Sequence, residues 1–224
     1  KKVDGMIIAP TKISKREINR LVDSHYPVLL FDRYFPEMHV NYVIINNEES
    51  SYKLVRHLID KGFRKIAIIT TNPHLLTMDM RREGYANALS DAHIRINPDL
   101  YGEVTYVNYQ DNIYSTLDRI FSAVPDVDGF FFTTHILAIE ALRYFYDRGI
   151  DINDGSWGLA CIHEDSLFRV LAPKMNIAHF PIEEIGNNAV RILLNQIRQS
   201  NDPEAGEYVP ESKVLPCRIE FRDQ

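Results

Sequence analysis

Short apolar runs alternate along this chain with longer segments whose apolar residues recur every three or four positions. The runs predict strands, because buried parallel strands are nearly continuous in apolar residues. They lie at 3–9, 28–31, 40–45, 66–69, 103–107, 129–132 and 157–162. The amphipathic segments predict helices at 48–61, 78–90, 112–124, 135–148 and 181–199, and a further helix that Ser14 caps and Pro27 ends.

This order of elements predicts an α/β fold. Strands that alternate with helices favour a mainly parallel sheet, or two such sheets, covered by helices. The last segment, 214–221, alternates apolar and polar residues and predicts one final strand. Pro216 within it favours an edge position, because proline lacks the backbone donor that a central strand needs.

Composition and charge narrow the class of protein. The 224 residues are 45% hydrophobic and 25% charged, with a net charge of −6, which is ordinary for a soluble globular protein. Net negative charge argues against nonspecific nucleic-acid binding by this chain. No apolar run reaches membrane-spanning length and no secretion signal is evident. Cys161 and Cys217 lie in apolar runs, which favours two buried thiols and a reducing cytoplasm. A hydrophobic strand at the very start predicts a fragment of a longer protein.

Polar residues follow four of the predicted strands. They are Asp32 and Arg33, then Asn72, Thr77 and Arg81, then Thr133, Thr134 and His135, and finally His163, Glu164 and Asp165. Open α/β sheets bind ligands at the carboxyl ends of their strands, so these residues predict a site for a small polar molecule. Arg81 stands out because a cation near a helix N-terminus opposes the helix dipole, a cost that a bidentate ligand would offset.

Each of these positions also has a structural interpretation. Arg81 and Arg82 are equally compatible with solvated surface residues, and Asp32 with Arg33 is compatible with a local ion pair. The run 163–165 lacks the spacing of metal ligands, so no metal site is expected. The motifs of hydrolases, phosphate-binding loops and dinucleotide-binding loops are absent from the sequence, so neither an enzyme nor a cofactor is expected.

Several segments taken together resemble the effector-binding domain of the lactose-repressor/galactose-repressor (LacI/GalR) family of bacterial transcription regulators. They are VDGMIIAP, PVLLFDR, the paired Asn46–Asn47 before a helix, HLIDKGFRKIAII, RREGYANAL and the long run from Trp157 to Leu194. Their order and spacing are more specific than any one of them. The resemblance covers essentially the whole chain.

The resemblance implies a two-lobed periplasmic-binding-protein-like (type I) fold with an incomplete first lobe. That lobe would hold 1–63 and 180–208, and the second would hold 64–179 and 209–224. A small-molecule effector, a sugar or sugar derivative, would bind between the two lobes. Its binding would shift the equilibrium between the open and closed arrangements of the lobes. The resemblance further implies a cytoplasmic homodimer that meets DNA through an N-terminal helix-turn-helix head absent from this chain, and no membrane contact.

The resemblance also assigns ligand-binding positions. They are Arg81, Thr77, Arg33, His163, Glu164, Thr134, Tyr106 and Phe180, with Tyr109 as the alternative to Tyr106. Thr134, His135 and His163 stand where the family commonly has Asn, Asp and Asp. Phe180 stands where a polar residue often meets the ligand. The departures at Thr134, His163 and Phe180 weaken a simple sugar assignment, because aspartate strongly favours sugar hydroxyls, whereas histidine donates, accepts or titrates near neutral pH.

Two other functions remain open at this point. A secreted solute-binding protein of a sugar transporter would use the same fold, and its signal peptide would distinguish it from a regulator. An enzyme with a cleft between lobes would need a nucleophile and base that no motif in the sequence supplies.

Overall fold

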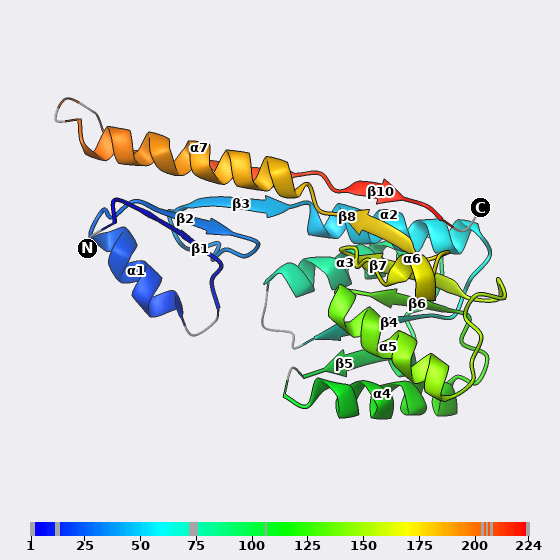
Figure 1. Cartoon of the computed structure of the whole chain (residues 1–224). Coiled ribbons are helices and arrows are strands. Elements are labelled where there is room, and N and C mark those ends of the chain that lie inside the picture. The colour runs from blue at the N-terminus through cyan, green and yellow to red at the C-terminus, as the bar shows by residue number, and fades with distance from the viewer. Residues whose placement is uncertain are drawn as a thin grey trace. The chain divides into compact units, whose positions relative to one another are not determined.

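A computed structural model describes residues 3–11, 14–71, 76–105, 107–202, 204, 206 and 208–222. The chain forms two compact units. Unit 1 consists of the described parts of Lys1–Asn46, His74–Thr77 and Pro181–Pro216, and unit 2 consists of the described parts of Asn47–Pro73, Met78–Phe180 and Cys217–Gln224. Each unit has its own sheet (Figure 1).

The sheet of unit 1 has four parallel strands in the order β1-β2-β3-β9. They are β1 (Met6–Ile8), β2 (Val28–Phe31), β3 (Asn41–Ile45) and β9 (Ser212–Leu215), accompanied by the helices α1 (Lys15–Asp23) and α7 (Ile182–Ser200). Residues of β2 alternate between two small cores. Leu29 packs with Ile192 of α7, whereas Val28 and Leu30 pack with Ile18 of α1.

The sheet of unit 2 has six strands in the order β10-β8-β7-β6-β4-β5. The strands are β4 (Ile66–Thr71), β5 (Tyr101–Val104), β6 (Gly129–Phe132), β7 (Gly158–Ile162), β8 (Asn176–His179) and β10 (Arg218–Glu220). β10 is antiparallel to β8, and every other pairing is parallel. The helices are α2 (Asn47–Asp60), α3 (Leu76–Asp91), α4 (Tyr109–Ala123), α5 (His135–Asp147) and α6 (Phe168–Leu171), with a 3-10 turn η2 at Pro98–Leu100.

Helices cover both faces of the sheet of unit 2. Phe130 and Phe132 of β6 belong to the large core that contains the buried residues of α4 and α5. Phe131, between them, points the other way and stacks on Tyr85 of α3, with ring centroids 6.4 Å apart. The near-continuous apolar run of β6 therefore reflects burial on both faces, which confirms the predicted α/β class.

Three details differ from the sequence predictions. The predicted single strand 214–221 is wrong: β9 pairs in unit 1 and β10 in unit 2, and Pro216 with Cys217 separates them. The strand predicted at 103–107 occupies Tyr101–Val104, and β8 was not predicted. Cys161 is buried and Cys217 is only partly buried, and both are free thiols.

The compact units divide the chain differently from the predicted lobes at three segments, which are α2, the described part of His74–Thr77, and 209–216. α2 lies in unit 2, because its buried residues, among them Leu54 and Leu58, face strands of the larger sheet. The segment 209–216 lies in unit 1, because β9 continues the parallel ladder of β3.

Candidate functional site

The carboxyl ends of β4, β6, β7 and β8 lie at one edge of the sheet of unit 2, because these four strands are parallel. Thr133, Thr134 and His135 follow β6, His163 and Glu164 follow β7, and Phe180 follows β8. Most of the predicted site residues therefore share one sheet edge, which is where open α/β sheets bind ligands.

Arg81 of α3 lies at the centre of this edge and is only 3% exposed. Its Nε donates to Oδ1 of Asn47 over 2.7 Å, and one of its terminal nitrogens donates to the carbonyl oxygen of Thr133 over 2.6 Å. Burial excludes the interpretation of Arg81 as a solvated surface residue. These charge-assisted hydrogen bonds hold the guanidinium in one orientation.

The RREGY segment, residues 81–85, contains the glycine at which α3 packs against α2. A Cβ atom on Gly84 would lie 2.2 Å from the carbonyl oxygen of Glu48 and 2.8 Å from the Cβ of Ser51, both in α2. Only glycine permits this approach of the two helices. The approach brings Asn47, the first residue of α2, within reach of Arg81. Tyr85 anchors the helix to the sheet by donating its hydroxyl to the carbonyl oxygen of Ile66.

A row of three aromatic rings begins beside the guanidinium of Arg81. The Cζ of Arg81 lies 5.8 Å from the ring centroid of Phe180, Phe180 lies 4.6 Å from His163, and His163 lies 4.7 Å from His135. We call Arg81, Asn47, Phe180, His163 and His135 the Arg81 cluster. His163 has a φ of 75°, a left-handed conformation that a residue other than glycine rarely adopts.

Burial lowers the pKa of His135, the nearby carboxylate of Asp165 acts in the opposite direction, and Arg81 lowers the pKa further. The neutral imidazole is therefore favoured at this position. A neutral imidazole offers one donor and one acceptor, so His135 is suited to a hydrogen bond with a bound polar group.

Threonine hydroxyls occur at the ends of β4 and β6. Thr133 donates to the carbonyl oxygen of Ile69 over 3.3 Å and contacts the hydroxyl of Thr70 at 3.2 Å. The hydroxyl oxygens of Thr71 and Thr134, and that of Thr77 in unit 1, are buried without a hydrogen-bond partner in the described part of the chain. Buried hydroxyls normally have a partner, so unmet hydroxyls at a sheet edge mark places where a ligand or water supplies one.

Glu164 is engaged in a network that joins three strands. It accepts from Arg222 over 2.8 Å and lies 3.1 Å from Nδ1 of His179. Glu220 of β10 accepts from Nε of Arg222 over 2.6 Å and lies 2.7 Å from Nε2 of His179. Arg222 lowers the pKa of Glu164 and, with His179, lowers the pKa of Glu220 to about 2. We call Glu164, His179, Glu220 and Arg222 the strand-end network.

The other predicted positions have different outcomes. Arg33 belongs to unit 1, where its Nε lies 3.4 Å from Asp32, in keeping with the local ion pair considered above. Tyr106 and Asn72 lie outside the described residues. Arg82, beside Arg81, is bound to Asp79 and donates to the hydroxyl of Tyr101 over 3.0 Å. Asn47, His179, Glu220 and Arg222 were not predicted as parts of the site.

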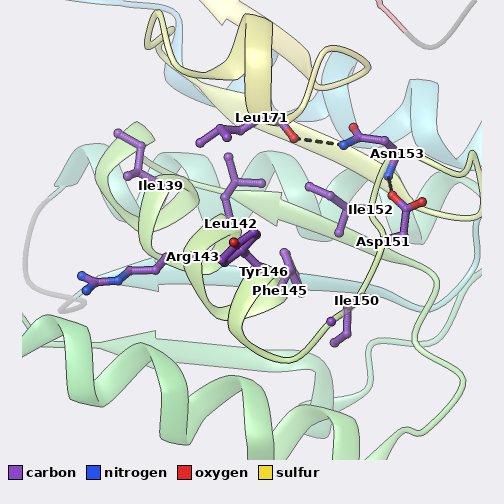
Figure 2. Close-up of a pocket in the computed structure, with 11 residues that line it drawn as sticks. Ile139, Leu142, Arg143, Phe145, Tyr146, Ile150, Asp151, Ile152, Asn153 and Leu171 are labelled. Carbon is purple, nitrogen blue, oxygen red and sulfur yellow. Dashed lines mark hydrogen bonds between the residues drawn. The ribbon is translucent and has the colours of Figure 1, made fainter.

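A separate groove of about 660 Å³ lies beside α5 (Figure 2). Side chains of α5, of the loop after it and of the end of α6 line this groove, and they include Ile139, Leu142, Arg143, Tyr146, Asp151, Ile152 and Leu171. We call it the α5 groove. It shares no residue with the Arg81 cluster, and its lining is mainly apolar.

The described residues contain neither a metal-binding group of side chains nor a helix suited to span a membrane. Within them, no group of three or more His, Cys, Asp or Glu side chains is arranged to hold a metal ion. The same residues contain no helix with the length and apolar character that spanning a membrane requires.

Comparison with known proteins identifies relatives over nearly the whole chain. A family model described as a periplasmic binding protein-like domain matches residues 55–223. The probable HTH-type transcriptional regulator EndR of Paenibacillus polymyxa is 29% identical over 224 residues, covering 97% of this chain and 64% of that protein. The ribose operon repressor of Haemophilus influenzae is 26% identical over 202 residues, covering 90% of this chain and 60% of that protein.

Solved structures agree on the fold. A complex of the transcriptional regulator CelR with cellobiose superposes with a TM-score of 0.84 at 22% identity, covering 99% of this chain and 65% of that chain. A LacI-family regulator from Enterococcus faecium with bound ribose gives a TM-score of 0.80 at 24% identity, covering 98% and 79%. The chain spans 64% of the length of the first curated relative.

Proposed function

Because the chain belongs to the family of periplasmic binding protein-like domains, we propose that it is the ligand-sensing domain of a LacI-type transcription regulator. The observation that carries the proposal is the buried Arg81, held by Asn47 and Thr133 at the carboxyl edge of the sheet of unit 2. A small polar effector, a sugar or sugar derivative, binds there.

The proposed ligand-contacting residues differ in the observations that support them. Arg81, His163 and Phe180 are supported by their mutual packing, and Thr77 and Thr134 by hydroxyls that are buried without a partner in the described residues. Arg33, Glu164 and Tyr106 rest on the family resemblance alone. Glu164 has a structural role as well, since Arg222 and His179 already engage its carboxylate.

The output of the sensor is control of DNA binding by another part of the whole protein. Relatives named as HTH-type regulators and a ribose operon repressor support this assignment, as does the acidic composition of the chain itself. A cytoplasmic location follows from that role. The alternative, a secreted solute-binding protein of a transporter, has less support, because the matched relatives named above are transcription regulators.

We further propose that a second copy of the chain covers the α5 groove. Tyr146, at its rim, is 85% exposed, and Leu171 is 46% exposed, so the groove presents apolar surface to solvent. The groove also carries one cation, Arg143, and one anion, Asp151. In a twofold dimer each charge meets the opposite charge of the partner, as a self-complementary interface requires.

A thermal-shift screen tests the sensor. The panel contains monosaccharides, disaccharides, sugar acids and nucleobases, and at least one compound should raise the melting temperature of the wild-type chain. Arg81→Ala should lose that stabilisation, because it removes the guanidinium at the centre of the site. Arg82→Ala is the matched control, since Arg82 is bound to Asp79 and Tyr101, and it should keep the response. A folded wild-type protein that no compound stabilises would contradict the proposal.

A further inference from the structure

The Arg81 cluster is rich in hydrogen-bond donors that favour negative charge. It brings one guanidinium and two imidazoles into a continuous set, with the two imidazole centroids 4.7 Å apart and both histidines beside strand ends. Arginine has five N–H donors and no acceptor, and an imidazole carries at least one N–H in either protonation state. Donors from α3, from the start of α5 and from the end of β7 therefore meet in one place.

The carboxylates next to the cluster in sequence are turned to other partners. Glu164, which follows His163, accepts from Arg222 and lies against His179. Asp165 accepts the backbone N–H of Leu167 over 2.9 Å, although its charge still acts on His135. A site made for a neutral sugar needs acceptors for hydroxyl protons, and carboxylates are the usual ones. Here Glu164 is engaged through both carboxylate oxygens, and Asp165 is engaged through one.

The surroundings of Arg81 make a charged acceptor more valuable. Arg81 is 3% exposed, and two of its acceptors, the amide oxygen of Asn47 and the carbonyl oxygen of Thr133, are uncharged. Hydrogen bonds from a guanidinium to an anionic oxygen are roughly twice as strong as neutral ones, and more so away from water. An anionic ligand group therefore gains more at this position than a hydroxyl does.

We propose that the effector of this chain is an acidic polyhydroxy molecule whose anionic group, a carboxylate or a phosphate, binds beside Arg81, His135 and His163. The inference rests on the sensor function proposed above and narrows its ligand class. The hydroxyls of the ligand lie toward Thr134, whose own hydroxyl is buried without a partner in the described residues.

Matched sugars provide the test. Glucose, glucuronate and glucose 6-phosphate form one series, and galactose, galacturonate and galactose 6-phosphate form another. Binding is measured by calorimetry and by thermal shift at neutral pH and constant ionic strength, with sodium acetate and sodium phosphate as controls for the free ions. We expect an acidic member of at least one series to bind about tenfold or more tightly than its neutral partner, a difference of about 1.4 kcal/mol. The carboxylate and phosphate arms show which anion the site takes.

Two variants locate the effect. Arg81→Lys keeps the positive charge but loses the planar fork, and His163→Leu removes the imidazole N–H donor, so each should weaken the acidic ligand more than the neutral one. Arg82→Lys should leave the preference unchanged. A neutral member that binds as tightly as its acidic partners would overturn the inference and leave the sensor in place. A folded chain that binds no member of either series, and nothing in the wider screen, would overturn both.

Discussion

The Nε of Arg81 donates to Oδ1 of Asn47 over 2.7 Å, and this hydrogen bond joins the middle of α3 to the first residue of α2. Both residues are buried. The geometry makes Asn47 a positioning residue: it fixes the orientation of the guanidinium without being needed for the charge itself.

Removing that acceptor should damage binding and stability together. Asn47→Ala leaves a buried, charged N–H without this partner, which costs about 1–3 kcal/mol of unfolding free energy. We expect ligand affinity to fall by roughly tenfold or more. Asn47→Asp restores an acceptor and should recover much of the stability. Urea denaturation and calorimetric titration measure the two effects.

Asn87→Ala is the control for Asn47→Ala. Asn87 also donates from α3 to α2, to the carboxylate of Glu48 over 3.0 Å, but the bond is exposed. Its loss should change the unfolding free energy by less than about 0.5 kcal/mol. Equal effects of the two substitutions on ligand affinity would contradict the positioning role.

Gly84 should not tolerate even a methyl group. Alanine favours a helix interior over glycine by about 1 kcal/mol, but its Cβ would lie 2.2 Å from the carbonyl oxygen of Glu48. The clash is with backbone, so α2 and α3 must separate, and we expect Gly84→Ala to destabilise unit 2 by about 2 kcal/mol or more. Because α2 carries Asn47, ligand affinity should fall as well.

The chain contains a matched glycine for this experiment. Gly186 lies inside α7, and a Cβ there would meet no atom within 4 Å. Gly186→Ala should therefore stabilise the protein by about 0.5–1 kcal/mol. Thermal and urea unfolding distinguish the two variants by sign. A stabilising Gly84→Ala would show that the helices do not approach as closely as described.

Much of this fold could be predicted because most strands are uninterrupted apolar runs. β8 escaped prediction because Asn176 opens it, and that residue is buried only because Leu159 and Arg222 satisfy its amide. The break between β9 and β10 was hidden because the alternation of apolar residues continues across it. A pattern of period two records burial on one face and does not record which sheet a strand joins.

The candidate site could likewise be predicted only in part from the sequence. Arg81 could be identified because a cation in the first turns of a helix opposes the dipole and calls for a reason. Its acceptor Asn47 lies 34 residues earlier, and only the α2–α3 packing at Gly84 brings the two together. Arg222, one partner of Glu164, lies 58 residues later, after an antiparallel strand that the sequence did not reveal. Local patterns carry no information on such pairs.

The strand-end network should make the free energy of unfolding depend on pH in the acidic range. The pKa of Glu220 is lowered to about 2, mainly by Arg222, from about 4.3 in an unfolded chain. A carboxyl whose folded pKa is depressed stabilises the fold above its unfolded pKa, and that stabilisation is lost as the pH falls through the folded value. The contribution of Glu220 is therefore present above about pH 5 and declines between about pH 4 and 2.

Glu220→Gln isolates this contribution. The difference in urea midpoint between wild type and Glu220→Gln should be largest near pH 6 and should shrink toward pH 2. Arg222→Gln is the companion variant, because it removes the main cause of the shift and should bring the loss closer to pH 4. A difference between wild type and Glu220→Gln that stays constant from pH 6 to pH 2 would show that Glu220 is not coupled to folding.

The α5 groove should decide whether the chain associates. Tyr146→Lys places a charge at the rim of the groove, at a side chain that is 85% exposed, so folding should be unaffected. If a second copy covers the groove, the lysine is buried against apolar surface and the dimer dissociation constant should rise by about tenfold or more. Val209→Lys, at a residue of unit 1 that is 76% exposed, is the control. Sedimentation equilibrium should show a weaker dimer for Tyr146→Lys alone, and equal association of both variants would place the contact on another surface.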